Sequence, residues 1–275
     1  MKDVPWVVFS DLDESLLDRS SYAFDEARPA LEEVKRRGIP LVLCTSKTAA
    51  ETLRFQELLG IEGPFIVEGG GGVYVPRGGF DRLPGTPQVR GRHLLLPLAE
   101  GREEVLQGLG YVKECTGNAV RGFDDMSAEE ISAETGLSLE MAVLAKDREF
   151  DEPFKFVRGE DEFAPHLPRL AYERGLRVTR GGRYHHLHGD TDKGRGVELV
   201  LGLYRKRLGE LRSLAVGDSE MDLPMLGAVD RPIAVQRPDG RHDFVLSSRV
   251  KGILRVEAPG PAGWNRGVLE VLAGG

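Results

Sequence analysis

The feature that most constrains the fold is a regular alternation of short apolar runs with longer stretches of helical periodicity. The apolar runs are VPWVVF (4–9), IPLVLC (39–44) and PFIVE (64–68). Between them lie two stretches, 25–37 and 47–60, in which apolar residues recur at helical spacing. Continuously apolar strands that alternate with helices are typical of a parallel sheet covered on both faces. The sequence therefore predicts an α/β fold with a doubly wound, Rossmann-like parallel sheet.

The same alternation returns in the last third of the chain, after a different middle block. The stretch 191–208 has helical periodicity, and 212–218 has the pattern of a strand that ends in a loop. The middle block, 84–187, mixes strand and helix patterns with an apolar periodicity of its own. We therefore expect a core of residues 1–83 and 188–275 that carries an inserted α/β domain, residues 84–187.

Composition narrows the classes of partner. The 275 residues carry a net charge of −7, so neither nucleic acid nor an acidic membrane surface is an expected partner. No apolar run approaches the roughly 18 residues that a membrane-spanning helix needs, and the N-terminus lacks a signal-peptide pattern. Two cysteines favour a reducing compartment, so we expect a cytoplasmic protein. The composition leaves the oligomeric state open.

Two aspartates, Asp11 and Asp13, follow the first apolar run in the string DLDES. Ligands of open α/β sheets bind beyond the carboxyl ends of the strands, where this pair is expected. A divalent cation would relieve the repulsion between the two carboxylates. One carboxylate could also act as a nucleophile, and the other as an acid and base. The alternative is that both residues only end the strand and shape a turn.

Three other stretches carry polar groups that suit a phosphoryl ligand and a cation. Thr45 and Ser46 end the second apolar run, where hydroxyls and backbone N–H groups can hold phosphoryl oxygens. Lys193 opens a predicted helix, a place where the helix dipole does not favour a cation. Asp218 and Asp222 follow another predicted strand. Ordinary helix capping, a solvated lysine and acids at a helix N-terminus are the corresponding alternatives.

Taken in order, these stretches resemble the four motifs of the haloacid dehalogenase superfamily of phosphotransferases. DLDES (11–15) is similar to its first motif, and LVLCTS (41–46) is similar to the second. Lys193 matches the third, and GDSEMD (217–222) matches the fourth. An insert between the second and third motifs corresponds to the C2 cap of that superfamily.

The resemblance implies a role for each motif residue. Asp11 would be the nucleophile that forms an aspartyl phosphate, and Asp13 the general acid and base. Thr45 and Ser46 would receive the phosphoryl group, and Lys193 would balance its charge.

It also implies a Mg²⁺ site. The cation would be held by Asp11, the backbone carbonyl of Asp13 and Asp218, and Asp222 would support it through water or the lysine. Many members have Asn where this chain has Met221, so no cation role is expected at that position.

Longer segments resemble one subfamily, the mannosyl-3-phosphoglycerate phosphatases. They are FIVEGGGGVYVPRG (65–78), the stretch 121–154 that contains GFDDM and REFDEPF, and 179–197. The implied reaction is Mg²⁺-dependent hydrolysis of mannosyl-3-phosphoglycerate to mannosylglycerate and phosphate. Alternatives are a phosphatase of glucosyl-3-phosphoglycerate or sucrose phosphate, a phosphomannomutase, and a catalytically silent sugar-binding protein.

The leaving group of that substrate carries a carboxylate and a sugar. Arginine, lysine, backbone groups near glycine, and hydroxyl or imidazole partners suit these groups. The predicted substrate-binding residues are Ser15, Lys47, Gly70, Met126, Ser127, Arg180, Gly181, Gly182, Arg183 and His185. His186 and His188 lack the further ligands of a zinc site, and Cys44 is expected to be a small apolar filler.

Overall fold

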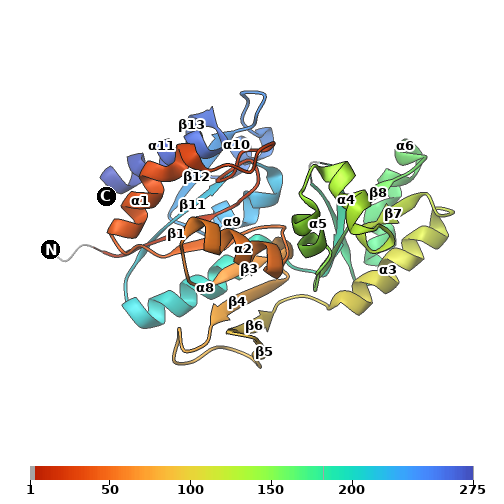
Figure 1. Cartoon of the computed structure of the whole chain (residues 1–275), viewed down its shortest axis with the longest axis horizontal. Coiled ribbons are helices and arrows are strands. Elements are labelled where there is room, and N and C mark those ends of the chain that lie inside the picture. The colour runs from red at the N-terminus through yellow and green to blue at the C-terminus, as the bar shows by residue number, and fades with distance from the viewer. Residues whose placement is uncertain (1–3, 182, 275) are drawn as a thin grey trace.

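The computed structural model describes residues 4–181 and 183–274, so the predicted substrate-binding residue Gly182 lies outside the described residues. The chain forms two lobes, each built on its own sheet (Figure 1). Both described ends of the chain lie on the first lobe, on the side away from the second (Figure 1).

The first lobe contains a nine-stranded sheet in the order β13-β12-β11-β1-β2-β3-β4-β6-β5. The pairs from β13 to β3 are parallel, and the pairs from β3 to β5 are antiparallel. The strands are β1 (Trp6–Ser10), β2 (Leu41–Cys44), β3 (Phe65–Val67), β4 (Gly72–Pro76), β5 (Gln88–Arg90), β6 (His93–Pro97), β11 (Arg212–Gly217), β12 (Arg231–Gln236) and β13 (Leu254–Pro259). The predicted doubly wound parallel sheet is confirmed.

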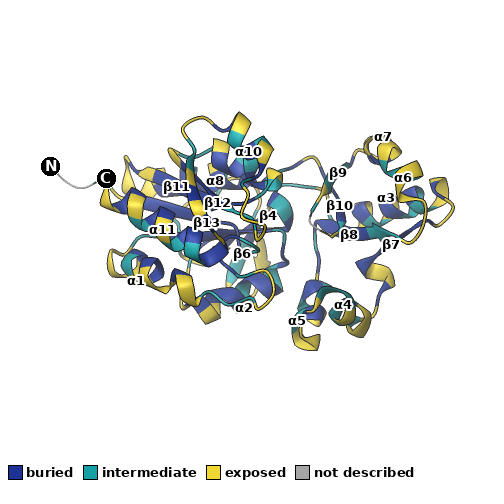
Figure 2. Ribbon diagram, turned by 90° about the horizontal axis from the view of Figure 1, so that it is seen from above, coloured by how far each residue is buried: buried dark blue, intermediate teal, exposed yellow. Residues whose placement is uncertain are grey.

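Helices bury both faces of this sheet because the central strands are apolar on both sides. Along β1, Val8 belongs to one buried cluster and Val7 and Phe9 belong to another. Figure 2 shows strands in the buried colour between helices with exposed outer faces. The helices of this lobe are α1 (Arg28–Arg36), α2 (Ala49–Leu59), α8 (Lys193–Leu208), α9 (Leu223–Gly227), α10 (Phe244–Arg249) and α11 (Gly260–Ala273), with the 3-10 turns η1 (Asp25–Ala27), η2 (Glu68–Gly70) and η5 (Glu220–Asp222).

The second lobe contains an antiparallel sheet in the order β7-β8-β10-β9. Its strands are β7 (Val120–Gly122), β8 (Asp151–Phe156), β9 (Arg177–Arg180) and β10 (His185–His188). Its helices are α3 (Arg102–Cys115), α4 (Ala128–Thr135), α5 (Leu139–Ala145), α6 (Glu160–Phe163) and α7 (Leu167–Tyr172), with the turns η3 (Phe123–Asp125) and η4 (Ala164–His166). One buried cluster of this lobe lies under α3 and α7, and a separate one lies between α4 and α5.

The expected start of the insert at residue 84 is wrong for two strands. β5 and β6 pair with each other and with β4, so they extend the first sheet. The pairing buries Leu95 and Leu96 in the clusters on the two faces of that sheet. The chain therefore enters the second lobe after β6. It returns between β10 and α8, close to the expected return at residue 188.

Among the described residues, no helix is long and apolar enough to cross a membrane.

Candidate active site

Three carboxylates from two strand ends meet at one edge of the parallel sheet. Asp11 follows β1, and Asp218 follows the neighbouring strand β11, whose register pairs Ser10 with Val216. Asp222 lies one turn further on in η5. Each residue has an oxygen within 4.8 Å of an oxygen of the other two, and all three are buried. Parallel pairing thus joins acids that lie more than 200 positions apart.

Lys193 lies inside this cluster at the first position of α8. Its Nζ is 2.6 Å from Asp11 Oδ1 and 2.6 Å from Asp222 Oδ1. Burial lowers the pKa of Lys193, but the two carboxylates outweigh this effect and raise it well above its ordinary value. The ammonium therefore stays charged, and its position beside Asp11 agrees with the predicted role of balancing charge there.

The cluster still has more negative charge than one lysine can balance. Burial raises the pKa of Asp11 to about 7, and Asp222 and Asp13 add to this effect while Lys193 opposes it. Burial and the neighbouring carboxylates also raise the pKa of Asp218 well above its ordinary value. A hard divalent cation would relieve this repulsion, so the donor set fits Mg²⁺.

Asp222 has a supporting position within the cluster. Its Oδ1 accepts a hydrogen bond from Lys193. Its Oδ2 accepts hydrogen bonds from the backbone N–H groups of Asp218 at 3.0 Å and Ser219 at 3.2 Å. These bonds orient the Asp218 loop, which fits indirect support of a cation better than direct ligation.

Asp13 differs from Asp11 in its exposure. Its side chain is 40% exposed, and Lys47 Nζ lies 3.0 Å from Asp13 Oδ1. Lys47 also lies 3.8 Å from Glu51 Oε1 and is itself buried. Asp13 therefore faces solvent space above the buried acids, where an acid and base can reach a leaving group or water.

The loop after β2 is held by a hydrogen bond within it and by one to β3. The Lys47 N–H donates to Thr45 Oγ1 at 3.1 Å, and the buried Thr45 N–H donates to the Ile66 carbonyl at 3.0 Å. Thr48 caps α2 in a capping box with Glu51. The capping role that was an alternative for Thr45 and Ser46 is thus filled by Thr48.

Two of the cavities between the lobes are lined by both Asp13 and His186. One has a volume of about 510 Å³, and first-lobe groups that include Asp11, Asp13 and Lys193 line it together with His186 of the second lobe. The other has a volume of about 200 Å³ and shares Asp13 and His186 with the first. Half of its remaining lining is cationic or aromatic, and the acids Glu14 and Glu51 also line it. The cationic and aromatic residues are Arg19, Lys47, Arg148 and Arg183 with Tyr22, Phe123 and Tyr184.

Comparison with known proteins gives the family of this chain. Residues 8–78 match the family model of haloacid dehalogenase-like hydrolases. A glucosyl-3-phosphoglycerate/mannosyl-3-phosphoglycerate phosphatase of Methanococcoides burtonii is 38% identical over 97% of this chain and 97% of its own length. The chain belongs to the haloacid dehalogenase-like hydrolase family. The family predicted from the sequence motifs is confirmed.

Two further relatives of this hydrolase extend the comparison. A mannosyl-3-phosphoglycerate phosphatase of Pyrococcus furiosus is 38% identical over 90% of this chain and 98% of its own length. A haloalkanoate-superfamily phosphatase of Bacteroides thetaiotaomicron has a solved structure that covers 99% of this chain and 96% of that chain, with a TM-score of 0.67 and 18% identity. The second similarity concerns the fold alone.

Two predicted substrate-binding residues of the first lobe have structural roles in the hydrolase. Ser15 is fully buried, and its hydroxyl donates to Asp218 Oδ1 at 3.3 Å. Gly70 has a φ of +102°, and a Cβ there would lie 2.1 Å from the Asp192 carbonyl oxygen. Gly70 thus allows η2 to approach the start of α8, where Lys193 lies. The structure explains both residues within the protein, and substrate binding by Ser15 and Gly70 stays a prediction.

Met126 and Ser127 of the second lobe are also structural. Met126 is buried in the cluster between α4 and α5. Ser127 caps α4, because its hydroxyl accepts from the Glu130 N–H in a capping box. The capping-box spacing was visible in the sequence, and the cap uses the hydroxyl that was expected to bind substrate.

The sequence predicts that His185 binds substrate, but the geometry of the strand favours its neighbour His186. Successive side chains of a strand point to opposite faces. His185 shares a face with Leu187 and stacks on Phe154 in the second lobe, with ring centroids 5.4 Å apart. His186 points the other way and lines both cavities. Each face of HHLH carries a histidine, so the histidines alone left the direction undetermined.

The remaining predicted residues lie at the cavities. Arg180 and Gly181 line the larger cavity, and Lys47 and Arg183 line the smaller one. Arg180 is exposed and lies 3.0 Å from Glu160. Met221 lies in the wall of the larger cavity.

Cys44, by contrast, has the structural role that was expected. It is buried in an apolar cluster. Burial raises the pKa of its thiol, and nothing in its surroundings suggests a nucleophile.

Sequence reasoning missed one buried network, which contains Arg148, Asp151, His186 and Glu68. Its members come from the REFDEPF segment, from β10 and from η2. In the sequence, REFDEPF stands out only through its resemblance to the subfamily, because local spacing does not show which distant residues this segment contacts.

Proposed function

We propose that this hydrolase is a Mg²⁺-dependent phosphatase, a phosphoric monoester hydrolase that converts mannosyl-3-phosphoglycerate to mannosylglycerate and phosphate. The observation that carries the proposal is the buried group of Asp11, Asp218 and Lys193, which lines a cavity together with Asp13. The relatives with 38% identity carry that activity in their names, which supports the choice of substrate.

In the first chemical step, Asp11 attacks the phosphorus atom. A bond forms between its carboxylate oxygen and phosphorus, and the bond from phosphorus to the glycerate oxygen breaks. Asp13 gives a proton to that leaving oxygen. Asp13 then takes a proton from water, whose oxygen attacks phosphorus and releases Asp11 and phosphate. Lys193 and the loop of Thr45 and Ser46 surround the transferring group.

Asp11 must be ionised to attack, although burial raises its pKa to about 7. Lys193, at 2.6 Å, favours the ionised form. When bound, Mg²⁺ would supply further positive charge at the nucleophile and the phosphoryl oxygens. The residues that would hold it are Asp11, Asp218 and the backbone carbonyl of Asp13, and Asp222 would support them.

The smaller cavity has the chemistry that the leaving group requires. The glycerate carboxylate needs a cation, and Lys47 and Arg183 line the cavity wall. A sugar ring needs aromatic surface and hydroxyl partners. Tyr22 and Tyr184 supply them, and Lys47 Nζ lies 5.1 Å from the Tyr22 ring centroid. The second lobe would therefore act as a cap that selects the leaving group, whereas the first lobe handles the phosphoryl group.

The compartment is part of the proposal. Cys44 and Cys115 are both free thiols, which fits a reducing cytoplasm. A small phosphorylated sugar-glycerate is the proposed partner, and the net charge of −7 argues against nucleic acid.

A phosphate-release screen with Mg²⁺ tests the proposal. Mannosyl-3-phosphoglycerate should have the highest kcat/KM, ahead of mannose 6-phosphate, sucrose phosphate and 3-phosphoglycerate. Glucosyl-3-phosphoglycerate belongs in the panel as the second candidate, because the Methanococcoides burtonii relative is named for both glycosyl substrates. If mannose 6-phosphate had a kcat/KM equal to that of mannosyl-3-phosphoglycerate, the proposed substrate would be wrong. Phosphate that moved along a sugar without release would indicate a mutase.

A further inference from the structure

One buried arginine of the second lobe contacts the predicted phosphoryl-binding loop, and the Thr48 hydroxyl just after this loop donates to the Leu144 carbonyl oxygen of the same lobe at 2.9 Å. Arg148 lies in the segment between α5 and β8, and its side chain is 4% exposed. Its Nη2 donates to the Ser46 carbonyl oxygen at 2.7 Å, across a sequence distance of 102 residues. A residue of the second lobe thus holds the backbone of the loop that follows β2.

The guanidinium group of Arg148 is already engaged within the protein. Its Nε donates to Asp151 Oδ1, and its Nη1 donates to the Ala145 carbonyl oxygen at 3.4 Å. The other carboxylate oxygen of Asp151 lies 2.9 Å from His186 Nδ1. With these bonds in place, Arg148 has a fixed orientation and is poorly suited to follow a substrate carboxylate.

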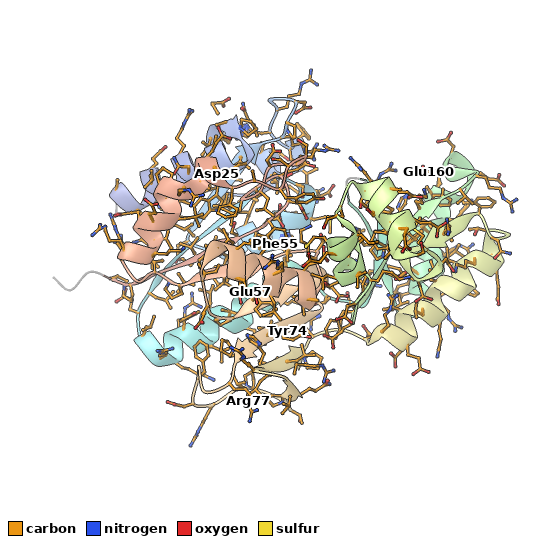
Figure 3. All side chains as sticks on the ribbon, in the orientation of Figure 1. Asp25, Phe55, Glu57, Tyr74, Arg77 and Glu160 are labelled. Carbon is orange, nitrogen blue, oxygen red and sulfur yellow. The ribbon has the colours of Figure 1, made fainter. Side chains whose placement is uncertain are left out.

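The segment that carries Arg148 is anchored in the first lobe. Glu68 of η2 accepts hydrogen bonds from the backbone N–H groups of Glu149, Phe150 and Asp151 at 2.8 to 3.1 Å. Phe150 is buried in a cluster of the first lobe. The hydroxyl of Tyr74, which Figure 3 labels on the first lobe, donates to the Glu149 carboxylate. These contacts hold Arg148 against the loop, in addition to the two chain segments that join the lobes.

The bond to Ser46 acts on one peptide unit. The Ser46 carbonyl and the Lys47 N–H belong to the same peptide group. Arg148 holds the oxygen side, and Thr45 Oγ1 holds the N–H side at 3.1 Å. Fixing this plane fixes where Ser46 points and where the Lys47 side chain begins its reach to Asp13.

We propose that Arg148 is a positioning residue for phosphoryl transfer, which holds the Thr45–Ser46–Lys47 loop in its reactive geometry from the second lobe. Asp151 and Glu68 hold Arg148 in turn. This role rests on the proposed phosphatase function. This role of Arg148 differs from substrate binding, because it concerns the transferring phosphoryl group and does not depend on the leaving group.

The test uses Arg148→Lys, which keeps a charge beside Asp151 but has one nitrogen in place of the three that reach Asp151, Ala145 and Ser46. Turnover is measured with mannosyl-3-phosphoglycerate and with p-nitrophenyl phosphate, which has no glycerate. We expect kcat to fall on the order of 10²-fold, by the same factor for both substrates, since small misplacements near the chemistry cost that much. Loss confined to the glycerate substrate would make Arg148 a substrate-binding residue and overturn the proposal.

Arg102→Ala is the matched control. Arg102 also donates to the REFDEPF segment, at the Asp151 carbonyl oxygen 2.9 Å away. Its other hydrogen bonds go to Glu152 and Asp124, which also belong to the second lobe. Its kcat should stay within about twofold of the wild type, since it does not act on the loop. If kcat fell as much in Arg102→Ala as in Arg148→Lys, general destabilisation of the second lobe would explain both losses.

Two further measurements test the proposal if Arg148→Lys folds poorly. In Arg148→Ala, added guanidinium ion should restore about tenfold or more of kcat with both substrates, as expected if the missing group acts by position. Asp151→Asn is nearly isosteric and should show a smaller loss, again equal for both substrates. Wild-type kcat in a folded Asp151→Asn and no loss in Arg148→Lys would overturn the proposal.

The proposed function and the role of Arg148 can fail separately. If the wild type cleaves p-nitrophenyl phosphate but not the sugar substrate, the substrate is wrong and the Arg148 comparison still holds. If it cleaves neither, calorimetric binding of orthovanadate with Mg²⁺ replaces turnover. Arg148→Lys should then bind orthovanadate on the order of 10²-fold more weakly than Arg102→Ala. Equal binding would overturn the role.

Discussion

The two lobes contribute to the site in different ways. The first lobe provides Asp11, Asp218 and Lys193, which are buried and bonded to one another or to their neighbours. The second lobe provides Arg180 and Arg183, which are exposed and lie at the loop between two antiparallel strands. The difference suggests that the chemistry depends on a rigid sheet edge, whereas recognition of the leaving group depends on a surface that can vary.

The largest effect should come from the nucleophile of the first lobe. Asp11→Asn removes the attacking oxygen and one cation ligand together. We expect kcat to fall on the order of 10⁴-fold or more, as for other nucleophile removals. Phosphate release measures the loss, and trapping of phosphate on the wild-type protein by mass spectrometry locates the covalent step.

Asp18→Asn is the control for that variant. Asp18 follows the same strand, but it accepts hydrogen bonds from Ser20 and Ser21 on the surface, and these bonds lower its pKa to about 2. Its turnover should match the wild type. Substantial turnover by Asp11→Asn would remove the covalent step from the mechanism.

A smaller loss is expected for Asp13→Asn. Acid and base assistance is worth about 10² to 10⁴ in rate, and Asp13 has no contact that holds the acid cluster together. The variant should bind substrate with a similar affinity while kcat falls within that range. A loss of only a few-fold would assign proton transfer to another group.

The crowded acids of the first lobe should make stability depend on pH and metal. The folded pKa of Asp11 is about 7, above the unfolded value of 3.8, so this group favours folding at low pH. That contribution is lost as pH rises from about 4 through 7. It amounts to about 2–4 kcal/mol by linkage, and Asp218 adds in the same direction. Thermal melts of the metal-free protein should show the decline.

Mg²⁺ should reverse that decline, because it relieves the same repulsion. The increase in Tm should be larger at pH 7 than at pH 5, and Asp218→Asn should reduce it. Activity should disappear with a chelator and return with Mg²⁺. A melting temperature that did not respond to Mg²⁺ at pH 7 would argue against a cation at the three aspartates.

The smallest effect is expected at the exposed Arg183 of the second lobe. Arg183→Ala should narrow the preference for mannosyl-3-phosphoglycerate over p-nitrophenyl phosphate by about tenfold, since an exposed cation contributes modestly to selectivity. Arg158→Ala changes an exposed arginine bonded to Gly117 and should leave the preference intact. If Arg183→Ala instead slowed both substrates equally, Arg183 would not be a residue that selects the leaving group.

The sequence by itself determined the parallel core and the residues at its carboxyl edge. Asp11, Thr45, Lys193 and Asp218 each follow or open an element whose apolar pattern is unambiguous. In a parallel sheet the carboxyl ends of the strands share one edge, so the order of elements alone brings these residues together.

Only the tertiary structure decided the second lobe and its contacts. Each face of the HHLH strand carries a histidine, so the roles of His186 and His185 were decided by what packs on each side. β5 and β6 belong to the first sheet because β4 provides a partner for them. Arg148 reaches Ser46 across 102 positions. Such contacts depend on how distant elements pack, and local residue spacing carries no record of that packing.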